Sequence, residues 1–233
     1  MNERIIGMQP WFETPPGRYL AQWEQQTLDQ AVVDLFGYHA VQLGLPIVDA
    51  LRANRMPHRW LALAPQEDTA GRTPHLHSAY DALPFEAASL DLVVLPHALE
   101  LSPDPHATLR EVERVLVPEG RVVITAFNPA SLWGIAGRVR GFKHREGQAS
   151  PWASVQDWVG YWRLRDWLRL LSFEVEAGRF GCYRPAVDSP EWLRRFSWLD
   201  RIGGRWWSIF GAAYFVVATK RVRGMRLLGG AWK

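Results

Sequence analysis

Short apolar runs alternate along the chain with segments whose apolar residues recur every three or four positions, a pattern that predicts strands separated by helices. The apolar runs predict strands at 39–43, 58–63, 90–95, 121–127, 173–180 and 213–219, with a weaker strand near Leu76. The longer period predicts helices at 15–35, at 155–171, in part at 191–210, and from Ser102 or Asp104 to Leu116. Pro46 favours one more helix through Arg52, because proline is tolerated in a first helical turn.

The run from Leu90 to Leu95 is apolar at nearly every position, which is typical of a parallel strand buried on both faces. Alternation of such strands with helices predicts an α/β fold, a doubly wound sheet with helices on both faces. In these sheets a ligand binds beyond the carboxyl ends of the strands, where the strand order reverses. Gly44 follows the first strand and Pro96-His97 follow the fourth, so we expect a ligand between these two strand ends.

A length of 233 residues, 48% of them hydrophobic, suffices for one large α/β domain. No apolar run approaches the length of a membrane-spanning helix, and the N-terminus lacks the apolar core of a signal peptide, so we expect a cytoplasmic protein. The single cysteine, Cys182, excludes an intramolecular disulfide and a multi-cysteine metal site. His75-x-His77 has no identifiable third ligand, and we predict no metal.

Four phrases between Leu83 and Gly120 carry a family resemblance: Leu83-Pro84-Phe85, Leu90 to Val94, Leu109-Arg110-Glu111 and Pro118-Glu119-Gly120. Together they resemble the small-molecule branch of the class I S-adenosylmethionine-dependent methyltransferases, of the methyltransferase type 11 kind. The resemblance implies a Rossmann-like seven-stranded sheet whose last strand is antiparallel. It also implies S-adenosylmethionine as cofactor and methyl transfer to an unidentified substrate, for which a small molecule is the first expectation.

The resemblance also implies which positions line the site. The expected cofactor-binding residues follow the first strand, precede the Leu-Pro-Phe phrase or follow the fourth strand: Gly44, Leu45, Asp81, Ala82, Leu83, Pro96 and His97. Asn128 and Trp133, after the fifth strand, are expected to line the substrate. No catalytic residue is identified. His97 is a candidate for proton transfer because histidine titrates near neutral pH, or it is an ordinary polar surface residue at a strand end.

The chain departs from the family pattern at two cofactor-binding points. Gly44 is the one glycine of a loop that has two or three glycines in the family, so this segment is either a shortened loop or a plain strand end. Ala79 stands where the family has an acid that meets the adenine amino group. Asp81 and Glu67 are the candidates to replace the missing acidic contacts. The departures favour a second interpretation, a catalytically inactive member of the fold that works as a binding or scaffold protein through its basic, Trp/Arg-rich C-terminal half, on nucleic acid or an anionic membrane surface.

Basic charge and tryptophan are concentrated in the second half of the chain. Residues 1–128 have 9 Arg and no Lys against 16 acidic residues, whereas residues 129–233 have 18 basic residues against 8 acidic ones. Most of the 13 tryptophans lie in the same half, among the arginines. Three interpretations remain open: tryptophans in the core with arginines at its rim, a lid over an aromatic or lipid-like substrate, or a surface that binds nucleic acid or an anionic membrane.

The domain organisation follows from these patterns. We expect one methyltransferase-like domain at 1–221, with residues 1–37 as an N-terminal helical cover. The segments 129–154 and 184–212 are expected to be lid-like insertions, the first of them loop-like because of its glycines, and 222–233 a basic tail.

Overall fold

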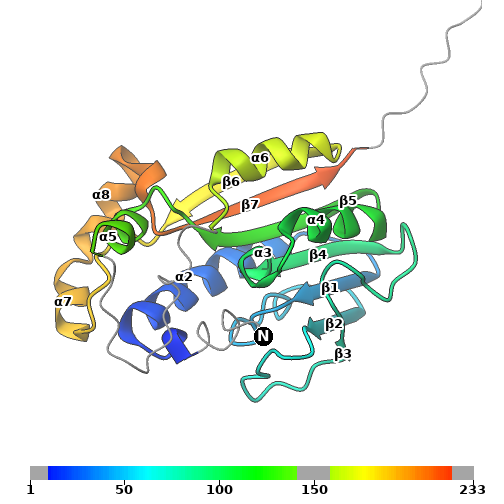
Figure 1. The fold of residues 1–233 in the computed structure, drawn as a ribbon, viewed down its shortest axis with the longest axis horizontal. Helices are drawn as coiled ribbons and strands as arrows, with labels where there is room; N and C mark the ends of the chain where they lie inside the picture. Colours follow the sequence, from blue (N-terminus) through cyan, green and yellow to red (C-terminus); the bar gives the residue numbers. More distant parts are fainter. Residues whose placement is uncertain (1–9, 141–157, 222–233) are drawn as a thin grey trace, which may run out of the picture.

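Seven strands form one sheet in the computed structural model, which describes residues 10–140 and 158–221 (Figure 1). In sheet order they run β3-β2-β1-β4-β5-β7-β6. Their bounds are β1 His39–Leu43, β2 His58–Leu63, β3 Leu76–His77, β4 Leu90–Pro96, β5 Leu116–Phe127, β6 Phe173–Gly181 and β7 Ala213–Lys220. The strands lie within a residue or two of the predicted ones, except that β5 begins five residues earlier, at Leu116.

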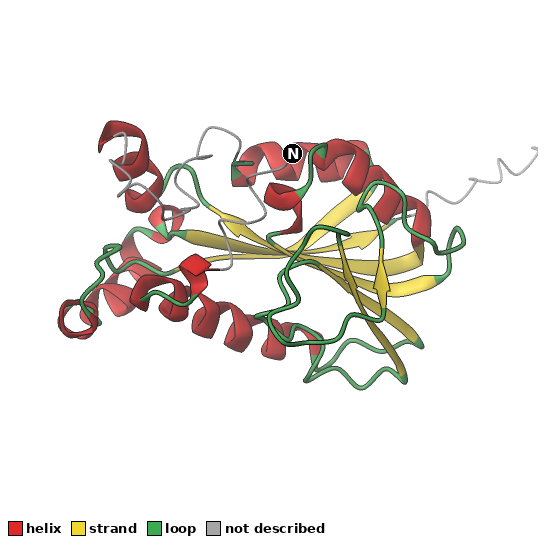
Figure 2. Ribbon diagram, turned by 60° about the horizontal axis from the view of Figure 1, so that its bottom comes forward, coloured by secondary structure: helices red, strands yellow, loops and turns green. Residues whose placement is uncertain are grey.

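The sheet confirms the predicted fold class. Strands β1 to β5 pair in parallel, and β7 pairs antiparallel with both β5 and β6. Strand β4 lies between β1 and β5 and is buried along nearly its whole length, as its apolar run predicts. Figure 2 shows helices on both faces of the sheet, which is the doubly wound arrangement.

The helices cover these faces and the carboxyl end of the sheet. Their bounds are α2 Pro15–Val32, α3 Ala98–Leu101, α4 Pro105–Val115, α5 Leu132–Arg140, α6 Tyr161–Leu170, α7 Pro190–Arg195, α8 Trp198–Trp206 and the short 3-10 helix η2 Ser208–Phe210. Helix α4 begins after Asp104, whose side chain accepts a hydrogen bond from the N–H of Ala107 at 3.0 Å. Of the two predicted start positions, Asp104 is therefore the cap.

The predicted helix from Pro46 to Arg52 is wrong, because this segment forms turns. Gln42, buried in β1, donates from Nε2 to the carbonyl oxygens of Gly44, Leu45 and Val48 at 2.8 to 3.2 Å. Its Oε1 accepts the N–H of Ala50 at 2.9 Å. The Gln42 side chain thus makes the hydrogen bonds that these backbone groups would otherwise make with one another in a helix. The connection from β1 to β2 therefore contains no helix.

The segment after β5 was predicted to be loop-like, and its first part is instead helix α5. Ser131 initiates it, with its Oγ accepting the N–H of Gly134 at 3.0 Å. A Cβ on Gly134 would lie 2.5 Å from the carbonyl oxygen of Pro129. This glycine therefore permits a close backbone approach inside a helix and does not mark a loop.

Asp91 has a structural role. Its Oδ2 accepts the N–H groups of Tyr38 and His39 at 2.8 and 2.9 Å, so the carboxylate at the start of β4 fixes the start of β1. Residues 141–154 of the first predicted insertion and the predicted tail at 222–233 lie outside the described residues. The second predicted insertion, 184–212, contains α7, α8 and η2. No helix in the described ranges combines the length and apolar character needed to cross a membrane.

Candidate functional site

The loop after β1 begins with two residues in the left-handed backbone region. Gly44 has φ +77° and Leu45 has φ +40°. A Cβ on Gly44 would lie 3.0 Å from the hydroxyl oxygen of Tyr80 and 3.5 Å from the Glu67 carboxylate. Gly44 is therefore required here both for its conformation and for its lack of a side chain, which a plain strand end would not need.

A buried carboxylate faces this loop from the end of β2. Oε1 of Glu67 accepts the N–H of Leu45 at 3.0 Å, and Oε2 accepts the N–H of Ala64 at 3.2 Å and the hydroxyl of Tyr80. Burial raises the pKa of Glu67, although its three hydrogen-bond donors oppose the shift. Burial, with the Glu67 carboxylate beside it, raises the pKa of Tyr80, so the phenol is a donor at neutral pH.

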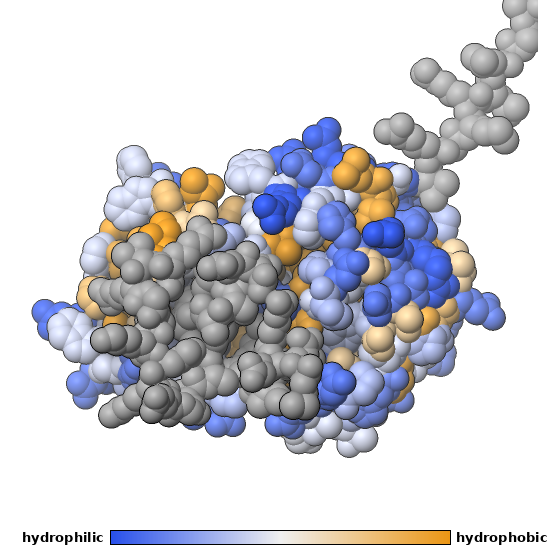
Figure 3. All heavy atoms as spheres, viewed as in Figure 1, coloured by the Kyte–Doolittle hydropathy of each residue, from blue (hydrophilic) through white to orange (hydrophobic). Residues whose placement is uncertain are grey.

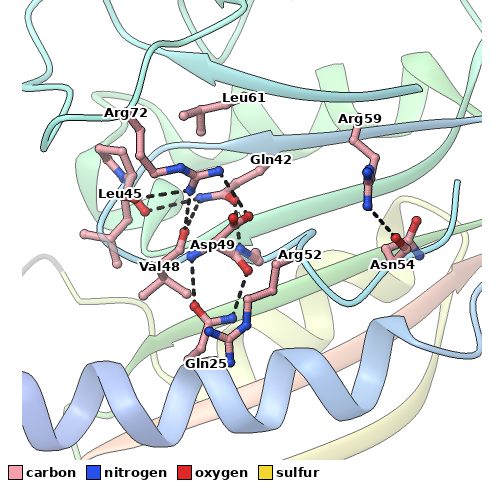
Figure 4. Close-up of polar contacts among 12 residues, drawn as sticks. Gln25, Gln42, Leu45, Val48, Asp49, Arg52, Asn54, Arg59, Leu61 and Arg72 are labelled. Atoms are coloured by element: carbon pink, nitrogen blue, oxygen red, sulfur yellow. Dashed lines mark hydrogen bonds and ion pairs between the residues drawn. The ribbon is translucent and has the colours of Figure 1, made fainter. Parts of the chain in front are cut away.

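Side chains from β1, from α2 and from the loop between β2 and β3 hold the loop in place (Figure 4). Besides Gln42, Arg72 donates to the carbonyl oxygens of Pro46 and Val48 at 3.2 and 3.1 Å and pairs with Asp49 at 3.0 Å. Gln25 of α2 exchanges two hydrogen bonds with the backbone of Asp49, at 2.8 and 2.9 Å. A cavity of about 330 Å³ lies beside this network and is lined partly by Arg59, Arg72 and His75.

The end of β4 holds a fully buried ionic group. His97, in the left-handed region at φ +53°, is bonded through Nε2 to Glu24 of α2 at 2.7 Å and through Nδ1 to Glu100 of α3 at 2.8 Å. Glu100 also accepts the N–H of Phe127 at 2.5 Å. The three side chains therefore tie α2 and α3 to the carboxyl ends of β4 and β5.

His97 carries a positive charge at neutral pH. Burial disfavours the imidazolium, but the two glutamates outweigh burial and raise the pKa of His97 to about 10. Both predictions for His97 are therefore wrong: its pKa is not near neutral, and the side chain is fully buried rather than at the surface. With a carboxylate on each ring nitrogen, the imidazolium has no free lone pair with which to accept a proton. The pKa of Glu100 is raised, and burial of its carboxyl group is the largest cause.

This pairing makes stability depend on pH. A pKa raised from 6.5 to about 10 in the folded state stabilises fully below pH 6.5, and the stabilisation is lost as pH rises toward 10. We expect the free energy of unfolding to fall by about 1.4 kcal/mol per pH unit between pH 6.5 and about 8.5. The upper limit is the usual pKa of a cysteine in an unfolded chain, above which thiol ionisation also contributes to the slope. Urea unfolding at several pH values measures the slope. His97→Gln is expected to remove it, and equal slopes in both proteins would refute the assignment.

Glu24 and Glu100 were not identified from the sequence as partners of His97, and only Glu24 could have been identified from the sequence pattern. It lies at a four-residue step between the buried Leu20 and Leu28 on the inner face of α2, where an acid needs a buried partner. Oε2 of Glu24 has no hydrogen-bond partner among the described residues.

The other residues predicted to line the cofactor are spread more widely. Pro96 is buried in β4, and Asp81 and Ala82 are exposed in the turn before Leu83. The N–H of Leu83 donates to Glu111 at 2.8 Å, which ties that turn to α4. Of the two candidate acids, the structure therefore brings Glu67, and not the exposed Asp81, against the Gly44 loop.

The two residues predicted to line the substrate are buried and hydrogen-bonded. Asn128 donates from Nδ2 to the carbonyl oxygens of Ile209 and Gly211 at 2.7 and 2.9 Å, and so ties η2 to the end of β5. Trp133 donates to the carbonyl oxygen of Arg184 at 2.6 Å. Both side chains therefore hold the rim of the site together.

An aromatic wall joins this rim to the ionic group. The ring centroid of Phe127 lies 4.4 Å from that of His97 and 5.6 Å from that of Trp11, which in turn lies 6.0 Å from Trp133. Within the described parts of the chain, no three His, Cys, Asp or Glu side chains gather in a way that could hold a metal ion.

Comparison with known proteins decides the family. Residues 56–124 match the family described as "Methyltransferase domain". The uncharacterized protein YafS of Escherichia coli (strain K12) is 30% identical over 180 residues, which cover 76% of this chain and 70% of YafS. The chain belongs to the class I S-adenosylmethionine-dependent methyltransferase family.

Solved structures agree with this methyltransferase fold. A putative methyltransferase of Haloferax volcanii, in complex with the Trm112 methyltransferase activator, superposes with a TM-score of 0.60 at 18% identity, covering 95% of this chain and 99% of that one. A possible histamine N-methyltransferase of Thermotoga maritima gives 0.57 at 16% identity, covering 87% and 92%.

The cofactor of this methyltransferase family is S-adenosylmethionine. The residues present fit it in chemical type. Gly44 forms a cradle that a Cβ would fill, and Glu67 supplies a buried carboxylate of the kind that accepts hydrogen bonds from ribose hydroxyls. The cradle is closed in this structure, because the Tyr80 hydroxyl is bonded to that carboxylate.

Proposed function

We propose that this chain binds S-adenosylmethionine at the carboxyl ends of β1 and β2 and transfers its methyl group to a small-molecule acceptor. The observation that carries the proposal is the buried Glu67 carboxylate, held against the left-handed Gly44-Leu45 backbone. In a doubly wound sheet this is the end at which ligands bind. A cytoplasmic location is part of the proposal.

The chain's own residues would bind, orient and exclude water. Gly44 and Leu45 offer close backbone approach, and Glu67 would accept hydrogen bonds from the ribose hydroxyls in place of the Tyr80 hydroxyl. The bound cofactor supplies an activated methyl group. Because alignment of the acceptor with that group can provide much of the rate enhancement, a dedicated base is not required. The charged His97 fixes the wall beside the site and does not remove a proton.

One observation favours the second candidate, a non-catalytic binding protein of the same fold. Each donor that Glu67 needs is already supplied by Leu45, Ala64 and Tyr80, so the carboxylate is satisfied without a ligand. Cofactor binding must therefore displace the phenol. The two candidates differ in whether that displacement occurs.

Titration with S-adenosylhomocysteine by calorimetry separates them. Tyr80→Phe is expected to tighten binding about tenfold, because the variant no longer loses a hydrogen bond to a buried carboxylate when ligand enters. Glu67→Gln is expected to weaken binding by about tenfold to a hundredfold, because an amide replaces the charged acceptor. Tyr183→Phe is the matched control, since that hydroxyl donates to the carbonyl oxygens of Phe180 and Ser208, away from Glu67.

Tighter binding by Tyr80→Phe and weaker binding by Glu67→Gln, with Tyr183→Phe unchanged, would support the cofactor site. Absence of binding by the wild type and by Tyr80→Phe at millimolar ligand would establish the non-catalytic alternative.

A further inference from the structure

Exposed apolar residues gather at one end of the molecule. Of the thirteen exposed large hydrophobic residues among those the structure describes, nine lie on α5, α7, α8 and η2 or between the last two. They are Leu132, Ile135, Trp192, Trp198, Ile202, Trp206, Trp207, Ile209 and Phe210, and we call them, with Arg194, Arg195, Arg201 and Arg205, the α8 surface. Figure 1 shows these elements beside the carboxyl ends of the strands, and Figure 3 shows orange apolar residues at that end.

Helix α8 turns its one acid inward. Asp200 accepts hydrogen bonds from Nε of Arg184 at 2.8 Å, from the N–H of Tyr183 at 3.2 Å, and from the hydroxyl of Tyr19 on α2. Gly203 allows the Tyr183 ring to pack against the helix, since a Cβ there would lie 2.3 Å from that ring. These contacts fix which face of α8 points away from the sheet.

The exposed residues of α8 are tryptophan, isoleucine and arginine, together with Gly204, whose Cβ position meets no atom within 4 Å. Trp198, Ile202 and Trp206 follow at four-residue steps and are 51%, 38% and 75% exposed, and Arg201 and Arg205 lie beside them. Indole rings prefer the interface between water and acyl chains, and arginines pair with anionic headgroups. Tryptophans and arginines on one face without an acid are typical of a helix that lies in a bilayer surface.

A cavity of about 280 Å³ opens in the same surface. It is lined by Leu132, Tyr183, Leu199, Gly203, Trp207 and Phe210, so its lining is almost entirely apolar. Exposed aliphatic residues such as Ile202 and Ile209 neither stack on bases nor contact phosphates, whereas acyl chains bury them. The balance of nine apolar residues against four arginines and one exposed acid, Glu191 of α7, therefore favours a lipid surface over a nucleic acid.

We propose that the α8 surface docks on an anionic lipid bilayer, with its tryptophans at the level of the headgroups and its arginines on the lipid phosphates. Docking of this kind does not depend on methyl transfer, so vesicle binding tests it separately from the proposed function. It would place the carboxyl end of the sheet, and the rim that Asn128 and Trp133 hold together, next to the membrane surface.

Co-sedimentation of the full chain with vesicles tests the proposal. We expect binding to mixed phosphatidylcholine and phosphatidylglycerol vesicles that weakens with added salt and is much weaker with phosphatidylcholine alone. Trp198→Ser with Trp206→Ser is expected to lower the partition coefficient by about a hundredfold, at about tenfold for each indole. Arg201→Glu with Arg205→Glu is expected to lower it at least about tenfold.

Matched controls come from other exposed positions. Phe36→Ser with Tyr38→Ser removes two exposed aromatic residues at the amino end of β1, opposite the α8 surface, and should leave partition unchanged. Arg55→Glu with Arg110→Glu repeats the charge change outside the α8 surface, and should weaken binding less than the α8 pair does. Absence of vesicle binding, equal losses in test and control variants, or salt-sensitive binding to RNA but not to vesicles would overturn the proposal.

Discussion

Replacing His97 with alanine is expected to destabilise the folded protein by about 3–5 kcal/mol, because two buried glutamates then lose the cation between them. The side chains of Glu24 and Glu100 are 0% and 3% exposed, so water does not solvate the two carboxylates once the imidazolium is gone. The cavity left by the ring adds to the loss. Urea unfolding near pH 7, with the slope checked for two-state behaviour, measures the effect.

A double variant distinguishes charge from packing. His97→Gln with Glu24→Gln removes one cation and one anion and leaves Glu100, which keeps its bond to the N–H of Phe127. We expect this double variant to lose less stability than His97→Gln alone, since both carry the same side chain at position 97 and only the single variant leaves two buried glutamates without a cation. An effect of His97→Ala below about 0.5 kcal/mol, as for an ordinary surface position, would show that the group does not stabilise the fold.

Gly44→Val is expected to weaken S-adenosylhomocysteine binding more than a hundredfold, if the chain binds this ligand as we propose. The new side chain enters the space between the β1 loop, Tyr80 and Glu67, where even a Cβ lies 3.0 Å from the Tyr80 oxygen. It also forces a β-branched residue into the left-handed region, which costs about 1–2 kcal/mol of stability. Calorimetry and urea unfolding measure the two effects separately.

Gly71→Val is the matched control for this substitution. Gly71 has almost the same backbone conformation, φ +76°, but a Cβ there meets no atom within 4 Å. Both variants should lose similar stability from backbone strain, and only Gly44→Val should lose ligand binding. Equal ligand affinity in the two variants would place the cofactor elsewhere on the sheet.

Sequence periodicity determined most of the fold. The apolar run at Leu90–Leu95 marked the central strand, and the amphipathic segment up to Leu116 marked α4, because burial on one or two faces leaves its own period in the sequence. The choice of Asp104 over Ser102 as the cap came from the structure. The four phrases from Leu83 to Gly120 implied the family through their resemblance to it. The helix predicted from Pro46 as a first-turn residue was wrong, because a side chain from the preceding strand takes the backbone hydrogen bonds of Pro46–Arg52.

Only the tertiary structure determined which residues meet at the strand ends. Glu67 and Tyr80 are thirteen residues apart, and Glu24 and His97 are 73 apart, so no local pattern announces either contact. Burial by those distant partners is what turns His97 from a near-neutral histidine into a charged, doubly bonded one. The chain by itself therefore determined the sheet and the family, because both follow from local periodicity and motif. The protonation states and the closed Gly44 cradle were decided by long-range packing, since a pKa and a steric contact depend on neighbours that only the folded chain supplies.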